Sequence, residues 1–180
     1  SSIYLHFPYC KHLCNYCDFY KLKLEEGKKE IHYSHFANYL DQSFLKLLEI
    51  LDREEMNLRE IETLYLGGGT PSLWGSDGIS FLRSWLEKQQ IYLAADHEWT
   101  LEVDPGTTTL EMLTKWQGLG VNRFSVGIQT LNPDIFPLMD RSHGIDQVYF
   151  LLQQLKELNC NFSVDFMLGL PHSEKYQRSI

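Results

Sequence analysis

The chain has 180 residues, of which 43% are apolar and 22% charged, as is ordinary for a globular protein with a hydrophobic core. Its 24 acidic and 16 basic side chains give a formal net charge of −8, which disfavours binding to a nucleic-acid backbone. No continuous apolar stretch of roughly 18 residues occurs, so we expect no transmembrane segment. Clustered cysteines without a secretory signal favour a reducing compartment, and we expect the cytoplasm.

Three of the four cysteines lie within eight residues near the beginning of the chain. Cys10, Cys14 and Cys17 form the spacing C-x3-C-x2-C directly after a short apolar run. Because their number is odd, a disulfide framework is disfavoured. Two kinds of metal site stay open. Zinc would take His6 or His12 as a fourth ligand, whereas an iron–sulfur cluster with three thiolates would leave one iron free for a substrate or cofactor.

Five short β-prone segments alternate with helical segments along the chain. The spacing of apolar residues predicts strands at 3–7, 62–66, 98–103, 123–129 and 162–168, and helices at 34–55, 77–88, 110–119 and 146–158. Ser76 and Thr109 are the predicted N-caps of the second and third helices. We expect an exposed loop at residues 21–29 and a proline-interrupted segment at residues 134–141.

The repetition of strand and helix predicts an α/β fold with a parallel sheet of βαβ units. Such a sheet either curls like part of a barrel or stays open and doubly wound. The chain stops about ten residues after the fifth predicted strand, which would leave a sheet edge uncovered. We therefore expect residues 1–180 to be one domain that is truncated at its C-terminal end.

Polar residues and glycines follow the ends of the predicted strands. The cysteines follow the first strand, and the run 67–70 (Gly-Gly-Gly-Thr) follows the second. Glu102 lies at the end of the third strand, Gln129 at the end of the fourth, and Asp165 in the second half of the fifth. Since the carboxyl ends of parallel strands meet at one rim, these residues predict a ligand site there.

Each of these residues also has a purely structural interpretation. The glycine run could be only a tight turn, although residues without Cβ would let main-chain groups approach a small polar ligand closely. Glu102 could form an ordinary salt bridge. The position of Gln129 alone does not distinguish a structural role from contact with a ligand. Asp165 lies in an apolar run and would need a partner or a ligand if buried, and Arg141 is one candidate partner.

Several separated segments resemble the radical S-adenosylmethionine (SAM) superfamily. They are LHFPYC and YCDFY around the cysteine loop, and LYLGGGTPSL, LEVDPGT, RFSVGIQTLN, LMDRSHG and VDFMLGLP further on. Within the superfamily they are similar to the branch that contains the oxygen-independent coproporphyrinogen III oxidases and the HemW haem chaperones. The resemblance implies a partial TIM-type (βα) barrel of six units, of which five are present here and the sixth is missing.

The resemblance also implies the cofactors. Cys10, Cys14 and Cys17 match the ligands of a 4Fe–4S cluster whose fourth iron chelates the amino and carboxylate groups of SAM. An electron donor protein would reduce the cluster, and SAM would be cleaved to methionine and a 5′-deoxyadenosyl radical. The positions that match SAM contacts in the family are Tyr4, Tyr16, Gly68, Gly69, Thr70, Glu102, Gln129, Arg141 and Asp165.

One position discriminates within this branch. The oxidases carry a fourth cysteine two positions after the third, whereas this chain has Phe19 there, as the HemW-like proteins do. The resemblance therefore favours a haem-binding chaperone that also binds SAM. The alternative is the oxidase itself, which decarboxylates coproporphyrinogen III to protoporphyrinogen IX. A structural zinc protein is the least favoured interpretation.

Overall fold

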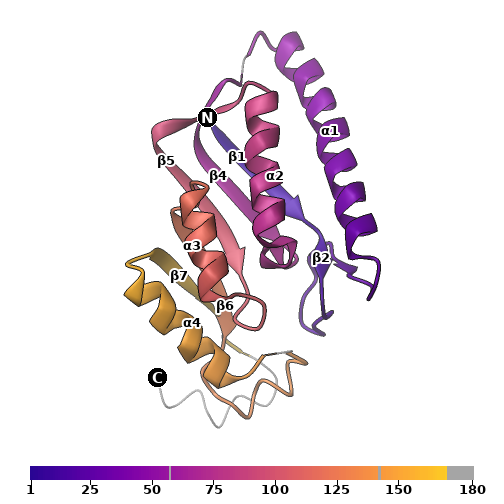
Figure 1. Ribbon diagram of the computed structural model, residues 1–180. Helices are drawn as coiled ribbons and strands as arrows, with labels where there is room; N and C mark the ends of the chain where they lie inside the picture. Colours follow the sequence, from indigo (N-terminus) through magenta and orange to yellow (C-terminus); the bar gives the residue numbers. More distant parts are fainter. Residues whose placement is uncertain (57, 142, 170–180) are drawn as a thin grey trace.

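The computed structural model describes residues 1–56, 58–141 and 143–169. Its centre is a five-stranded sheet of β1 (Ser2–Phe7), β4 (Glu60–Gly68), β5 (Tyr92–Val103), β6 (Arg123–Gln129) and β7 (Asn161–Phe166). The strands are neighbours in the order in which they occur in the chain, and every neighbouring pair is parallel. All carboxyl ends of the strands therefore lie at the same edge of the sheet (Figure 1).

Four helices connect these strands: α1 (Lys29–Arg53), α2 (Gly75–Lys88), α3 (Leu110–Gly118) and α4 (Ile145–Glu157). When strands follow one another in chain order, right-handed crossovers place all connecting helices on one face of the sheet. Figure 1 shows α2, α3 and α4 side by side along that face, and α1 joins them where the Trp85 indole donates to Asp41 at 2.7 Å. The barrel-like alternative is confirmed, and the doubly wound one is wrong.

The two faces of the sheet differ because side chains alternate along each strand. Apolar residues such as Leu64, Leu101 and Phe124 are fully buried in the core against the helices. Each contributes roughly 1.5–3 kcal/mol by leaving water. The residues between them on the same strands, for example Tyr65 and Glu102, point to the opposite face and line a cavity there. The cavity face of the sheet is thus polar.

A second, two-stranded sheet closes the base of the cysteine loop. β2 (Tyr9–Cys10) pairs in parallel with β3 (Leu22–Lys23), within the stretch 21–29 that was predicted to be an exposed loop. The Leu22 and Leu24 amides donate to the carbonyls of Pro8 and Cys10 at 2.7 and 2.8 Å. Most of the stretch is an exposed loop, as predicted. Only the strand at Leu22–Lys23 was missed, because two residues of strand carry no periodicity that a sequence pattern can reveal.

Two helix starts also differ from the predictions. α1 begins at Lys29 rather than at residue 34, because Tyr33 extends its packed face and donates its hydroxyl to the Leu73 carbonyl. Ser76 is not an N-cap, because the 3-10 helix η1 (Pro71–Trp74) leads directly into α2 and leaves Ser76 inside its first turn. Thr109 does cap α3, since its hydroxyl accepts from the Met112 amide at 3.3 Å.

Four of the five strands differ in extent from the predictions, and β1 and β4 are longer than the predicted 3–7 and 62–66. β5 begins at Tyr92, six residues earlier than expected, because its first residues pair with Glu60 and Ile61 of β4. β7 ends at Phe166, so Leu168 lies beyond the strand that was predicted to include it. The last residues of the VDFMLGLP motif, 170 and 171, lie outside the described part of the chain.

We predict that Gly68→Ala destabilises the protein by about 3 kcal/mol. Gly68 has φ +117°, and a Cβ there would lie 2.7 Å from the His6 ring and 2.9 Å from the Phe7 carbonyl oxygen. Gly27 also has positive φ, +74°, but open space around it, so Gly27→Ala should cost only about 1 kcal/mol. Urea unfolding of both variants tests this prediction, and equal losses would contradict it.

Candidate cofactor site

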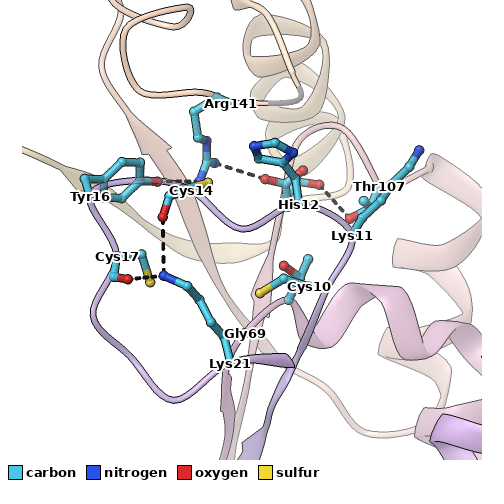
Figure 2. A pocket seen from close by; sticks show the side chains of 12 residues that line it. Cys10, Lys11, His12, Cys14, Tyr16, Cys17, Lys21, Gly69, Thr107 and Arg141 are labelled. Carbon is cyan, nitrogen blue, oxygen red and sulfur yellow. Dashed lines mark hydrogen bonds and ion pairs between the residues drawn. The ribbon is translucent and has the colours of Figure 1, made fainter. Parts of the chain in front are cut away.

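The three clustered cysteines come together at the carboxyl end of β1. Cys10 is buried in β2, whereas Cys14 and Cys17 lie half-buried on the loop that follows. All three thiols are free and line one pocket, together with Tyr16 and Arg141 (Figure 2). Three thiols from one short loop facing one pocket are the donor set that an iron–sulfur cluster requires.

Burial raises the pKa of the Cys10 thiol, and a hydrogen bond with Thr70 opposes part of that shift. The neighbouring Cys17 and Cys14 raise the pKa further, whereas the Lys21 ammonium lowers it. The Cys10 thiol thus resists ionisation as long as no metal compensates the charge of its thiolate. Because cysteine binds a metal centre as the thiolate, occupancy of the site is coupled to pH.

The Lys21 side chain ties the cysteine loop together. Its ammonium donates to the carbonyl oxygen of Cys14 at 3.3 Å and to that of Cys17, as Figure 2 shows. Lys21 itself precedes β3, so this contact joins the two half-exposed cysteines to the base of their loop. The loop therefore keeps its shape through main-chain contacts and does not rely on the thiols alone.

The two histidines considered as zinc ligands have other partners. His6 Nδ1 lies 3.0 Å from the Tyr4 hydroxyl, and its Nε2 lies 2.8 Å from the carbonyl oxygen of Tyr20. His12 Nε2 lies 2.9 Å from a carboxylate oxygen of Asp140. Within the described residues, no three His, Cys, Asp or Glu side chains are arranged around a single metal ion. A cluster differs from a single ion because each thiolate binds a different iron atom.

A larger cavity of about 670 Å³ adjoins the thiol pocket, a size typical of small-molecule sites. Of the residues predicted to contact SAM, all but one line it: Tyr16, Gly68, Gly69, Thr70, Glu102, Gln129, Arg141 and Asp165. The exception is Tyr4, whose side chain is 57% exposed and whose hydroxyl contacts His6. Cys17 lines both spaces, so a cofactor in the cavity would lie beside the thiol pocket.

Glu102 presents its carboxylate to this cavity from β5. Oε1 accepts from the Tyr65 hydroxyl and Oε2 from the Gly68 amide, both at 2.9 Å. Burial raises the pKa of Glu102, the two hydrogen bonds lower it, and the carboxylate of Asp165 raises it. The net pKa lies above its ordinary value, so a cationic or hydroxyl-bearing ligand would stabilise the ionised form.

The glycine run serves close packing more than donation to a ligand. The Gly68 amide donates to the Glu102 carboxylate. The Gly69 amide donates to the Phe7 carbonyl at 2.7 Å, and the Thr70 amide donates to the Tyr9 carbonyl at 2.9 Å. A Cβ at Gly69 would lie 2.7 Å from the Tyr9 carbonyl oxygen. The run thus offers a ligand close approach, whereas its N–H groups already have internal partners.

The predicted pairing of Asp165 with Arg141 is wrong. Asp165 is exposed and accepts a hydrogen bond from the Ser125 hydroxyl at 3.1 Å. Arg141 instead donates through Nη2 to Asp104 at 3.0 Å, with side chains 11% and 15% exposed. The sequence pattern placed Asp165 in an apolar run, but on β7 it lies on the polar face of the sheet and needs no buried partner.

Asp104 and His143 belong to the site although the sequence did not single them out. His143 Nδ1 lies 3.0 Å from Asp104 Oδ2, and the Gly106 amide donates to Oδ1 at 2.9 Å. Burial by itself would raise the pKa of Asp104, but His143, Arg141 and the Gly106 amide together hold it below its ordinary value. Asp104 directly follows β5, so the rule that located Glu102 could also have located it.

The residue that ends β6 has an unusual backbone conformation. Gln129 has φ +64°, in the left-handed region, where the pairing of β6 with β7 changes register. Its carbonyl accepts from the Met167 amide at 2.9 Å, and it lines the larger cavity. Glu55, Gln90, Asp140 and Asn159 also have positive φ, so the place of Gln129 in the cavity lining, and not its positive φ alone, points to a role in the site.

The proline-interrupted segment 134–141 covers the cysteine loop. Ile135 and Met139 are buried, and Tyr16 of the loop packs against them. The Asn15 side chain donates to the Leu138 carbonyl at 3.3 Å. Two segments that lie more than a hundred residues apart in the sequence therefore form one wall of the site.

The chain, which places three thiols beside a polar cavity at the carboxyl edge of a parallel sheet, matches a known family. The model of the radical SAM superfamily matches residues 4–177, and the chain belongs to this superfamily. Membership implies a 4Fe–4S cluster and SAM as cofactors. Among the described residues, no helix has the length and apolar character needed to cross a membrane.

Particular relatives are also similar to this chain. It is 32% identical over 180 residues to the heme chaperone HemW of Buchnera aphidicola (subsp. Schizaphis graminum), covering 95% of the chain and 43% of the relative. It is 33% identical over 172 residues to HemW of Escherichia coli, covering 94% and 43%. The structure of the E. coli coproporphyrinogen III oxidase HemN superposes with a TM-score of 0.78 at 30% identity, covering 94% of this chain and 37% of HemN. The chain thus spans about two fifths of these proteins.

We predict that Asp104→Asn lowers the free energy of unfolding by about 2–3 kcal/mol at pH 7, because it removes the charge that pairs with Arg141. The pKa of Asp104 is lowered by folding, so its stabilisation is present above the pKa of the unfolded state, about 3.9. The stabilisation is lost as the pH falls below that value.

The difference in the free energy of unfolding between the original protein and Asp104→Asn should therefore shrink as the pH falls from about 5 to about 3, a range that contains the unfolded-state pKa of about 3.9. Urea unfolding at each pH measures it. Asp41→Asn is the matched control, since Asp41 accepts from the neutral Trp85 indole. A difference for Asp104→Asn that stays the same at every pH would contradict the prediction.

Proposed function

We propose that Cys10, Cys14 and Cys17 hold a 4Fe–4S cluster and that SAM binds in the adjoining cavity. The thiols line one pocket, and that pocket shares Cys17 and Arg141 with the larger cavity. Three thiolates would hold three of the four irons and leave the fourth without a protein ligand, available to SAM. When bound, the cluster supplies the electron for reductive cleavage of SAM, and the protein's task is to orient SAM and to exclude water.

The cavity offers groups that match the functional groups of SAM. The Glu102 carboxylate suits the ammonium group or the ribose hydroxyls, because burial has raised its pKa and a bound cation would offset that cost. The Arg141 guanidinium suits the carboxylate, and the Tyr16 ring offers a face for the adenine. Gly68 and Gly69 allow close approach, while the remaining proposed contacts are polar: Tyr4, Thr70, Gln129 and Asp165.

For the full-length protein we propose the function of a haem chaperone of the HemW kind, which binds haem and transfers it to an acceptor. The observation that carries this proposal is Phe19, which is 71% exposed and lines the larger cavity. The oxidases of the resembling branch carry a cysteine at this position. The names of the relatives at 32% and 33% identity support the same choice.

The oxidase is the second candidate, favoured by the similarity to HemN and by the set of cavity residues that match SAM contacts. In that case the protein would act on a porphyrinogen. Both candidates need an electron donor protein as a partner, and we propose a cytoplasmic location because all four described cysteines are free thiols.

We predict that Cys10→Ser, Cys14→Ser and Cys17→Ser each abolish the cluster of the full-length protein after anaerobic reconstitution. Iron, acid-labile sulfide and zinc are measured for each chain, together with the electron paramagnetic resonance spectrum of the reduced protein. Cys160→Ser is the matched control and should keep its cluster, because Cys160 lies after α4 and accepts from Gln117 instead. Zinc without iron and sulfide in the original protein would overturn the proposal.

We predict that the full-length protein binds haem, seen as a shift of the haem absorption spectrum, and leaves coproporphyrinogen III unconverted under anaerobic, reducing conditions with SAM. Phe19 carries no thiol that could act beside the cluster, which is the physical reason for the second expectation. Formation of protoporphyrinogen IX would decide for the oxidase and against the chaperone. Protein with substituted cysteines from the experiment above is the control for cluster-dependent conversion.

A further inference from the structure

We propose that Asp104 and His143 are positioning residues that hold the cysteine loop in place through Arg141. They fix the Arg141 guanidinium, and Arg141 fixes Tyr16, which lies between Cys14 and Cys17. We call these four residues, Asp104, Arg141, His143 and Tyr16, the interlock. The expected effect of the interlock on SAM binding rests on the proposed function, whereas its effect on the loop does not.

The Asp104 carboxylate holds the other residues of the interlock in position. Oδ2 accepts from Arg141 Nη2 and from His143 Nδ1, each at 3.0 Å, and Oδ1 accepts from the Gly106 amide at 2.9 Å. The His143 side chain is fully buried, and those of Asp104 and Arg141 are 15% and 11% exposed. With both oxygens in use inside the protein, the carboxylate is held by the turn that follows β5 and has little freedom to move.

The Arg141 guanidinium connects Asp104 to the cysteine loop. Nη1 donates to the Tyr16 hydroxyl at 2.9 Å, and Nη2 also donates to the Gly127 carbonyl of β6 at 2.6 Å. Figure 2 shows the guanidinium joined to the Tyr16 hydroxyl at the end of its ring. Because a guanidinium is planar and its donors have fixed directions, holding one nitrogen also aims the other.

Other contacts between the loop and the covering segment 134–141 are weaker ties. His12 and Asp140 form a pair at 2.9 Å, but their side chains are 38% and 60% exposed. Exposed pairs of this kind contribute little, since water screens them. The bond from Asn15 to the Leu138 carbonyl is long, at 3.3 Å, and also exposed. The part-buried bond between Arg141 and Tyr16 is therefore the strongest of these polar contacts between the loop and the segment.

The two halves of the cysteine loop are held in different ways. Cys10 lies in β2, where pairing with β3 and a contact with Thr70 hold it. Tyr16 is within two residues of both Cys14 and Cys17, and its ring packs on the buried side chains of Ile135 and Met139. Lys21 also donates to the carbonyls of Cys14 and Cys17, but this contact lies within the loop and does not tie it to the segment 134–141. Loss of the interlock should therefore loosen the half of the loop that contains Cys14 and Cys17 relative to that segment and leave the Cys10 half in place.

Amide hydrogen exchange of the cluster-free, full-length chain tests this directly. In Asp104→Asn and in His143→Gln, the Cys17 amide, which donates to the Cys14 carbonyl at 3.3 Å, should exchange about tenfold faster, while the amides of β2, β3 and the central strands keep their rates. His97→Gln is the matched control for His143→Gln. The His97 ring nitrogens lie 2.8 and 3.1 Å from the carbonyls of Ala94 and Gly120, near the amino ends of the strands.

A double-mutant comparison tests whether the interlock acts as one chain of contacts. If Asp104 acts through Arg141 on Tyr16, then Asp104→Asn combined with Tyr16→Phe should accelerate exchange no more than the stronger single substitution. Additive effects would overturn the proposed route. Unchanged exchange of the Cys17 amide in both Asp104→Asn and His143→Gln would overturn the proposal, and so would uniform acceleration over the whole chain, since the effect would then be global.

Equilibrium binding of SAM to the reconstituted protein separates the interlock from the proposed function. We expect the Kd for SAM to rise about tenfold in Asp104→Asn and in His143→Gln, because a displaced Arg141 pairs less well with the carboxylate of SAM. Faster loop exchange with an unchanged Kd would support the interlock and count against the proposed role of Arg141 toward SAM. Absence of SAM binding in the original protein would count against the proposed function alone.

Discussion

The common direction of the five strands is the constraint on which the rest of this structure depends. Because β1, β4, β5, β6 and β7 are parallel and follow chain order, each carboxyl end opens on the same edge. Segments that are far apart in the sequence meet there, as the bond between Tyr16 and Arg141 shows across 125 positions. An antiparallel arrangement of the same strands would divide these residues between two edges and leave neither edge with a complete set.

The same edge brings charges into a partly buried environment, and the protein treats two neighbouring carboxylates differently. Glu102 and Asp104 are two positions apart on and just after β5. Burial raises the pKa of Glu102, whose partners are neutral donors, whereas His143 and Arg141 hold the pKa of Asp104 down despite burial. Asp104 is thus committed to structure, and Glu102 keeps capacity for a cationic or hydroxyl-bearing ligand. This division supports the proposed SAM site.

Much of the site could be predicted from the sequence because its determinants are local. Alternating apolar residues located the strands, and many of the residues predicted at their ends, among them Gly69, Glu102 and Gln129, line one cavity. Tyr4, which only the resemblance singled out, does not line it. The start of α1 was wrong because tertiary packing of Tyr33 against the segment of η1 extends the helix beyond its apolar stripe. The partner of Arg141 was also wrong, because which carboxylate reaches a cation depends on competition in three dimensions.

The sequence by itself determined the spacing of Cys10, Cys14 and Cys17 and the order of strands and helices, since spacing and periodicity are properties of consecutive residues. Only the tertiary structure decided that Asp104 contacts both His143 and Arg141, that Asp165 is exposed, and that Gln129 adopts a left-handed backbone conformation. These features follow from burial and from the choice among several possible partners. Both are settled when segments distant in the sequence pack together, and no local pattern encodes them.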